Sequence, residues 1–160
     1  MAPDEETRLQ PEDVNHEGTA AGERLLPTFG RRRGRRLSDH KKALLTRVLP
    51  RFALPQPQEG VCFDPRTVFD CAVADIWLEI GFGAGEHLAG QALKHRDIGF
   101  LGCEPYINGV AALIARIEGL ELDNIRIFAD DARRLLPHLP NACLGRIFLL
   151  FADPWPKLRH

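Results

Sequence analysis

Four short apolar runs, separated by segments with helical spacing, most constrain what this 160-residue chain can fold into. The runs are interpreted as strands and cover residues 75–80, 98–103, 124–128 and 146–151. Strands that are apolar throughout indicate a sheet that is buried on both faces, which is typical of parallel sheets. The alternation predicts the α/β class, with a doubly wound parallel sheet.

The segments between these runs predict the connecting helices. Apolar residues recur at helical spacing in 86–95 and 107–119, whereas 132–139 is expected to be a short helical or irregular piece. Four strands make only a portion of a doubly wound sheet, and the last of them would leave an apolar edge exposed. We therefore expect the sheet to be incomplete at its C-terminal side, with further strands following His160 in a longer protein.

Charge is strongly segregated along the chain, although the formal net charge is only −1. Residues 1–30 carry a net charge of −5, residues 31–60 carry +7, and the remainder carries −3. Five of the six residues in "RRRGRR" are arginines. Such a basic segment in a nearly neutral chain indicates an arm with a polyanionic partner.

These features divide the chain into three parts. Residues 1–27 lack periodicity and aromatic side chains and are expected to be a disordered acidic tail. Residues 28–60 form the basic arm, with a short helix that begins near Ser38 and stops at Pro50, followed by a Pro-rich connector. Residues 61–160 are expected to form the N-terminal part of the main domain.

Several classes of protein are not indicated by the composition. No run of about 18 apolar residues and no secretory signal pattern is present, so we expect a cytoplasmic protein with no membrane association. The six histidines show no metal-ligand spacing, and we expect no metal site. The four cysteines are widely spaced and are expected to be small buried thiols in a reducing cytosol: Cys62, Cys71, Cys103 and Cys143.

A glycine-rich turn follows the first predicted strand, in "LEIGFGAGEH", with glycines at Gly81, Gly83 and Gly85. Glycine there permits positive φ and close approach of a ligand to the backbone. A dinucleotide fingerprint would need a third glycine at position 86, where Glu86 stands and would repel a pyrophosphate. Glu79, two residues before the first glycine, favours a nucleoside with a cationic end, such as S-adenosylmethionine. A nicotinamide-dependent oxidoreductase remains an alternative.

Acidic residues also follow the other predicted strands. Glu104 ends the second strand, where a carboxylate can bind both hydroxyls of a ribose, and Asp130 and Asp131 follow the third, where they could meet an adenine amine. Asp153 follows the fourth strand. Because the carboxyl ends of parallel strands meet at one edge of a sheet, we expect these side chains to converge on one ligand.

The segment after the fourth strand reads Asp-Pro-Trp-Pro and ends in basic residues. The prolines stiffen the loop, and Trp155 offers a flat face on which a base can stack. Lys157, Arg159 and His160 can supply cations for phosphate groups. Alternatively, this segment is a Pro-rich turn with a tryptophan in the core.

Taken together, these stretches resemble the tRNA (guanine-N7-)-methyltransferase family of the bacterial type. The resemblance extends from about residue 29 to 160 and is carried by "FGRRRGRRLS", "LEIGFGAGEHL", "GCEPY" and "NIRIFADDA" leading to "FADPWPKLRH". It implies a Rossmann-like fold and an enzyme that transfers a methyl group from S-adenosylmethionine to N7 of a guanine in the tRNA variable loop, which forms 7-methylguanosine. It further implies tRNA as the partner, and we expect a monomer.

The resemblance also implies roles for the matching residues. The cofactor contacts would be Glu79, the glycines of the turn, Glu104, Asp131 and Asp153, of which Asp153 would also be catalytic. Lys157, Arg159 and His160 would contact the substrate. Ala152 replaces a proline and Leu158 a basic residue that are usual in the family, and the family's Thr-x-x-Glu motif is absent from this chain. Beside the nicotinamide-dependent oxidoreductase, a second alternative is therefore an RNA-binding fragment of this fold without turnover.

Overall fold

The structure is a computed structural model that describes residues 34–150, and its centre is a four-stranded parallel sheet. The strand order is β3-β2-β1-β4. The strands are β1 (Asp75–Ile80), β2 (Ile98–Cys103), β3 (Ile125–Phe128) and β4 (Arg146–Phe148). Each pair of neighbours is parallel, and this confirms the predicted α/β class.

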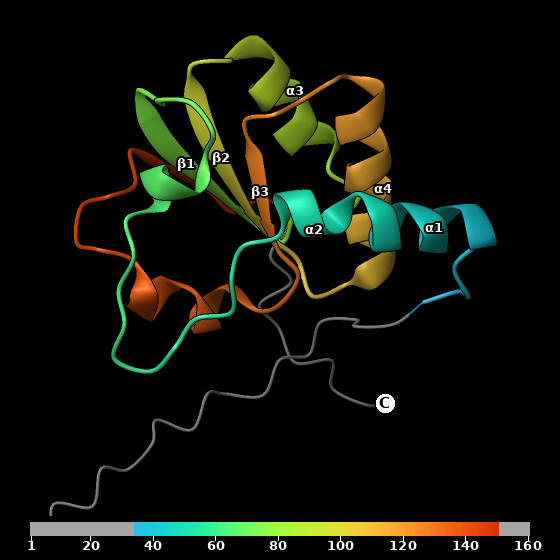
Figure 1. Cartoon of the computed structure of the whole chain (residues 1–160), viewed down its shortest axis with the longest axis horizontal. Coiled ribbons are helices and arrows are strands. Elements are labelled where there is room, and N and C mark those ends of the chain that lie inside the picture. The colour runs from blue at the N-terminus through green and yellow to red at the C-terminus, as the bar shows by residue number, and fades with distance from the viewer. Residues whose placement is uncertain (1–33, 151–160) are drawn as a thin grey trace, which may run out of the picture.

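The α-helices gather on one face of the sheet, as Figure 1 shows. Helix α3 (Glu86–Lys94) connects β1 to β2, and α4 (Ile107–Gly119) connects β2 to β3. Helices α1 (Asp39–Arg47) and α2 (Leu49–Phe52) lie over α4 and β3.

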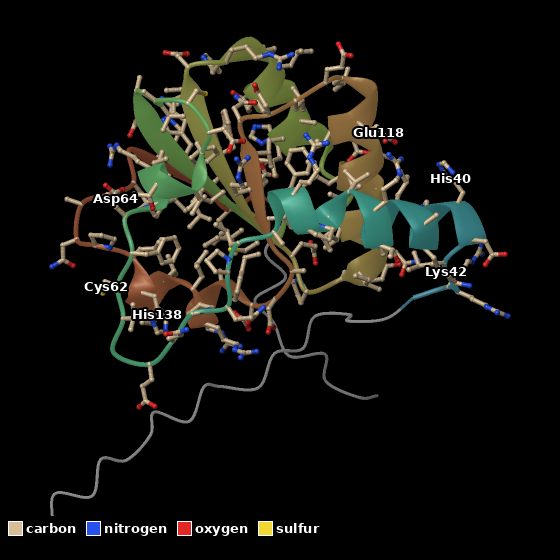
Figure 2. The ribbon with its side chains drawn as sticks, viewed as in Figure 1. His40, Lys42, Cys62, Asp64, Glu118 and His138 are labelled. Carbon is tan, nitrogen blue, oxygen red and sulfur yellow. The ribbon has the colours of Figure 1, made fainter. Side chains whose placement is uncertain are left out.

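The opposite face is covered by short 3-10 turns and the loops around them. These turns are η1 (Pro65–Val68), η2 (Ala132–Arg134) and η3 (Leu136–His138). The irregular piece expected after the third strand is therefore two 3-10 turns, and they carry the crossover from β3 to β4. In Figure 2, Cys62 and His138 lie next to each other at this side, where the Cys62 thiol donates to the carbonyl of Pro137. Cys62 and Cys71 are exposed because both lie in the loops that flank η1, so the expectation of buried thiols was wrong for these two cysteines.

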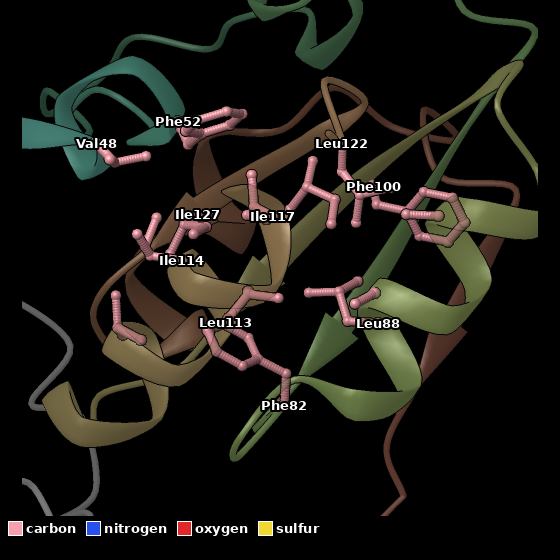
Figure 3. Close-up of a cluster of buried hydrophobic side chains, with 14 of the residues drawn as sticks. Val48, Phe52, Phe82, Leu88, Phe100, Leu113, Ile114, Ile117, Leu122 and Ile127 are labelled. Atoms are coloured by element: carbon pink, nitrogen blue, oxygen red, sulfur yellow. The ribbon is translucent and has the colours of Figure 1, made fainter. Parts of the chain in front are cut away.

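Successive side chains along a strand point to opposite faces of the sheet, and this divides the apolar side chains between two clusters. The helix-side cluster contains Phe100 of β2 and Ile127 of β3, packed against Leu88, Leu113 and other side chains of the helices (Figure 3). The turn-side cluster contains, from the sheet, Ile76, Leu78, Leu101, Cys103 and Phe128. Because both faces are covered by apolar side chains, the strands are mainly apolar, with Asp75, Glu79, Arg126 and Arg146 as the charged exceptions.

The order of the strands places a switch point beside β1. The chain leaves β1 toward β2 on one side, and returns through the turns to pair β4 with the other side of β1. Helices α3 and α4 lie on one face, and η2 and η3 lie on the other, so the connections wind in both senses. In open parallel sheets, ligands bind outside the carboxyl ends of the strands at such a point.

Two predicted boundaries were wrong. Pro50 does not stop the helical segment: it is the second residue of α2, where its missing N–H would have no helical partner in any case. Strand β4 ends at Phe148 and not at residue 151, because Phe148 is in register with Glu79, and β1 turns away two residues later at Gly81. Smaller differences of one residue occur at the start of β3 and the end of α3.

Strand β4 forms an edge of the sheet among the described residues, as expected. The side chains of Ile147 and Leu149 are 54% and 59% exposed there. On the far side, His40 projects from α1 into solvent, and Lys42 of the same helix pairs with Asp39 (Figure 2). Within residues 34–150, no helix is long and apolar enough to cross a membrane.

Candidate functional site

Three glycines with positive φ form the turn that connects β1 to α3. The φ angles of Gly81, Gly83 and Gly85 are +71°, +59° and +77°. Residues with a side chain rarely adopt this left-handed conformation, whereas glycine adopts it readily. A Cβ built on Gly81 or Gly83 would meet no atom within 4 Å. The backbone of the turn is therefore open on this side, and it leaves room for a ligand at the carboxyl end of β1.

Helix α4 holds this turn in place from behind. A Cβ on Gly109 would lie 2.1 Å from the carbonyl oxygen of Gly83, so only glycine lets the first turn of α4 approach this closely. Farther along α4, Nε of Arg116 donates a hydrogen bond of 3.1 Å to the carbonyl of Ala84. The guanidinium of Arg116 also pairs with Glu86 at the start of α3. The shape of the turn is thus fixed by packing and by polar contacts.

Glu104 connects the turn after β1 to the turn after β2. Its Oε2 accepts a 2.8 Å hydrogen bond from the N–H of Gly83, and its Oε1 accepts one of 2.9 Å from the N–H of Tyr106. Only 8% of the residue is exposed. Each carboxylate oxygen can accept about two hydrogen bonds, so one acceptor position remains on each oxygen. Two neighbouring hydroxyls of a ribose would match these positions.

Glu79 lies at the end of β1 and is paired with a histidine of α3. Its Oε2 is 2.7 Å from Nδ1 of His87, and only 3% of Glu79 is exposed. Burial raises the pKa of Glu79, and the hydrogen bond and charge of His87 act in the opposite direction. The ring of His87 packs edge-on against Phe148 of β4, with 4.8 Å between the ring centroids. Three elements therefore meet at this carboxylate.

Asp131 follows β3 and begins η2. Its Oδ1 accepts a 2.9 Å hydrogen bond from the N–H of Arg133, and the guanidinium of Arg133 binds both of its oxygens. This contact raises the pKa of Arg133. Oδ2 of Asp130 pairs with the guanidinium of Arg134, and Oδ1 accepts a 2.8 Å hydrogen bond from the N–H of Asp131. Both predicted carboxylates are thus already engaged by arginines, which the sequence interpretation did not anticipate.

Cys103 shows that two of these carboxylates lie on the same edge of the sheet. Burial, followed by the negative charges of Asp131 and Glu104, raises the pKa of the Cys103 thiol to about 12. Cys103 is the last residue of β2, and Glu104 follows it directly. The neighbouring strand end brings Glu79 close, because Ile80 is in register with Cys103. Glu79, Glu104 and Asp131 therefore lie at the ends of neighbouring strands on one edge of the sheet, and their convergence on a single ligand stays a prediction.

The remaining predicted site residues lie outside the described part of the chain: Asp153, Lys157, Arg159 and His160. Their predicted roles stay predictions. Within residues 34–150, no group of three or more histidine, cysteine, aspartate or glutamate side chains could hold a metal ion.

The structure adds residues that the sequence interpretation did not single out. His87 and Arg116 are among them, although "GEH" directly after the glycines could have directed attention to His87. Gly109 is another: a glycine in the first turn of a predicted helix indicates close packing, and here it packs on Gly83.

A basic cavity of about 460 Å³ lies where the arm meets α4. Its lining includes Arg35, Arg36 and Lys41 from the arm and Tyr106 and Asn108 from the start of α4. Nδ2 of Asn108 donates a 2.9 Å hydrogen bond to the carbonyl of Arg35, which ties the arm to α4. Since the N–H of Tyr106 also binds Glu104, this cavity adjoins the carboxylate site.

A larger hollow of about 580 Å³ is separate from this site. It lies beside the C-terminal end of α4, and its lining includes Phe52, Glu118, Leu122 and Arg126. The guanidinium of Arg126 is held by three backbone carbonyls and by Asp70. This hollow contains none of the acidic residues that converge at the strand ends.

Comparison with known proteins is consistent with this geometry. Residues 74–160, which include every strand, match the family described as "Putative methyltransferase". The chain is 48% identical over 146 residues to a protein of Paramagnetospirillum magneticum named tRNA (guanine-N(7)-)-methyltransferase, covering 89% of this chain and 60% of that protein. Proteins of the same name from Rhodopseudomonas palustris and Rhodospirillum rubrum are 47% and 46% identical, covering 94% and 82% of this chain.

The chain spans 59% of the length of the R. palustris protein and 52% of the R. rubrum protein. The family match covers more than half of the chain and contains the glycine turn, Glu79, Glu104 and Asp131. Because the family match covers more than half of the chain and the relatives are 46–48% identical over most of it, the chain belongs to this methyltransferase family.

Proposed function

We propose that this chain carries the S-adenosylmethionine site of a tRNA (guanine-N7-)-methyltransferase, which forms 7-methylguanosine in the variable loop. The observation that carries the proposal is the convergence of two buried carboxylates, Glu79 and Glu104, on an open glycine turn at the switch point of the sheet. The names of the relatives supply the reaction and the substrate.

The described residues fit this cofactor. The open space over Gly81 and Gly83 could take the body of a nucleoside, and Glu104 has one acceptor position on each oxygen for the ribose hydroxyls. Glu79 would face a cationic group of the ligand. Asp131 is the proposed partner of the adenine amine, held in place by Arg133.

A nicotinamide dinucleotide fits less well. A pyrophosphate normally binds at the N-terminus of the helix after the glycine turn. Here that first turn contains Glu86, whose carboxylate is fixed by Arg116 of α4. The residues at this helix end therefore support a ligand without phosphate groups.

The chemistry asks the protein mainly for alignment and charge. When bound, S-adenosylmethionine supplies a methyl group on a positively charged sulfur. Guanine N7 has a free lone pair and no proton, so no strong general base is needed. Holding the two partners in line can lower a barrier by about 7–11 kcal/mol at best. We propose that Asp153 stabilises the positive charge that develops on the purine.

The basic arm is the proposed contact to the tRNA backbone. Arg35, Arg36 and Lys41 line the cavity beside the carboxylate site, and Lys157, Arg159 and His160 are proposed to add contacts to the substrate. We further propose that the protein acts as a monomer in the cytoplasm, where tRNA is modified.

The test is to measure binding of S-adenosylmethionine and of NAD by isothermal titration calorimetry, with Glu104→Ala as the matched variant. We expect the wild type to bind only S-adenosylmethionine and the variant to lose at least tenfold in affinity, since both Glu104 hydrogen bonds and both ribose contacts are removed. Preference for NAD would overturn the proposal.

The methyl acceptor is tested with unmodified tRNA, followed by mass spectrometry for 7-methylguanosine. An active relative serves as the positive control, and Asp153→Asn should lower turnover far more than cofactor affinity. Binding of tRNA should also weaken steeply as salt is raised. If cofactor and tRNA bind but no 7-methylguanosine forms, the chain is an RNA-binding fragment of this fold without turnover.

A further inference from the structure

We propose that His87 is a positioning residue for the cofactor: the N–H at its Nδ1 holds the carboxylate of Glu79 ionised and correctly oriented for a cationic group of the ligand. This inference rests on the proposed S-adenosylmethionine site. It concerns a residue of α3 whose neighbour in the sequence is the glycine turn and which, among residues 34–150, reaches the carboxylates of the site through Glu79.

The geometry leaves one oxygen of Glu79 for a ligand. Oε2 is 2.7 Å from Nδ1 of His87, whereas Oε1 has no hydrogen-bond partner among residues 34–150. An ionised carboxylate can only accept hydrogen bonds, so Nδ1 must carry the proton in this contact. The His87 bond therefore fixes the rotation of the carboxylate and leaves Oε1 available.

The position of His87 is itself fixed by packing. Its ring lies edge-on against Phe148, with centroids 4.8 Å apart, and it is the second residue of α3, directly after the glycine turn. The side chain is one-third exposed, whereas that of Glu79 is 4% exposed. A histidine placed in this way can hold a buried carboxylate without being buried itself.

Burial works against the ionised form of Glu79. It raises the pKa of the carboxyl, and His87 is the only residue in the described range that lowers it. The charged groups on the neighbouring elements are engaged elsewhere. Glu86 pairs with Arg116, Glu104 accepts two backbone N–H groups, and the guanidinium of Arg146 lies 4.2 Å from the centroid of the Trp77 ring. His87 is thus the described residue that favours the charged form of Glu79.

The sign of the pH effect follows. A ligand cation binds ionised Glu79, so this part of the affinity is present above the pKa of Glu79 and is lost as the pH falls through it. Removing His87 raises that pKa further. In a plot of cofactor affinity against pH, the fall in affinity on the acidic side (the acidic limb) should therefore move to higher pH when His87 is replaced.

The experiment compares three variants of the full chain. His87→Phe keeps a ring against Phe148 but removes the N–H, and His87→Asn keeps an amide N–H close to the position of Nδ1. His95→Phe is the matched control, because His95 ends the same helix and its ring packs on Trp77, 5.1 Å away. Affinity for S-adenosylmethionine is measured by calorimetry from pH 5.5 to pH 9.

We expect His87→Phe to weaken affinity about tenfold at neutral pH, with its acidic limb moved to higher pH, as for loss of a hydrogen bond to a charged group. We expect His87→Asn to stay within about threefold of the wild type, and His95→Phe to be unchanged. His87→Ala, which adds no bulk, should repeat the loss if the phenylalanine variant folds poorly. Unchanged affinity and an unmoved limb in both replacements would overturn the proposal.

A second measurement separates this inference from the proposed function. In the protein without cofactor, ¹³C NMR of labelled glutamate should show the titration of Glu79 moving to higher pH in His87→Ala and not in His95→Phe. If the wild type fails to bind S-adenosylmethionine, the proposed function fails, and this titration still decides the role of His87. An unmoved Glu79 titration would overturn it.

Discussion

The glycine turn predicts a graded series of stabilities when each glycine is replaced by alanine. Gly81→Ala adds a side chain in the left-handed region but in open space. Gly85→Ala does the same and also places Cβ 2.7 Å from Cδ1 of Leu113. Gly90, inside α3, has ordinary helical φ and open space around the added Cβ. The three sites thus separate strain, strain with overpacking, and simple helix propensity.

The magnitudes follow from these differences. Left-handed alanine costs about 1–2 kcal/mol, and overpacking adds about 1–3 kcal/mol. Gly81→Ala should therefore lower the free energy of unfolding by about 1–2 kcal/mol and Gly85→Ala by about 2–5 kcal/mol. Gly90→Ala should raise it by roughly 0.5–1 kcal/mol, since alanine is favoured over glycine inside a helix.

Urea unfolding monitored by circular dichroism measures these changes, with the m-value as a check that only stability changed. For a chain of this size, Gly85→Ala should lower Tm by on the order of 10 °C. In a double-mutant cycle, Leu113→Ala should cost less in the Gly85→Ala background than in the wild type. Equal losses for Gly81→Ala and Gly85→Ala, or a loss for Gly90→Ala, would refute the reasoning.

Three further outcomes are expected at buried polar groups. Asn124→Ala should lower the free energy of unfolding by about 3 kcal/mol in urea titrations, because Nδ2 donates to three backbone carbonyls in or beside α3 and β2; a loss below 1 kcal/mol would contradict this. Glu79→Gln should raise Tm at pH 7 while it weakens cofactor binding, because the raised pKa of Glu79 means that its ionised form opposes folding as pH rises through that pKa; a lower Tm would contradict this. Iodoacetamide at pH 8 should modify the exposed Cys62 and Cys71 and spare Cys103, whose thiol is buried and has a pKa raised to about 12. Peptide mass spectrometry measures the modification, and faster modification of Cys103 than of the two exposed thiols would contradict this.

The strands and the acidic edge could be predicted from the sequence because both depend on short-range patterns. Six apolar or small residues in a row, as in β2, indicate a strand covered on both faces, and a glycine cluster directly after β1 indicates a turn with positive φ. Once the strands are parallel, the residues after them must share an edge. The shared edge of Glu79, Glu104 and Asp131 could therefore be predicted, whereas their common ligand stays a prediction.

The features that were missed depend on contacts between distant segments. The length of β4 is set by where β1 turns away, and no property of residues 149–151 reveals that. The pairing of His87 with Glu79 needs α3 to fold back beside β1, which spacing alone does not specify. Pro50 was misjudged for a different reason: a proline ends one helix but is equally suited to the first turn of the next.

The two hydrogen bonds that Glu104 accepts make this position a poor starting point for changing cofactor preference by protein engineering. Aspartate would be one methylene too short to reach both backbone groups, and glutamine would turn an N–H donor toward another donor. Either replacement would release the glycine turn together with the sugar. The same carboxylate oxygens of Glu104 therefore serve both the proposed ligand and the fold. Changes of cofactor preference should be sought first at neighbouring positions.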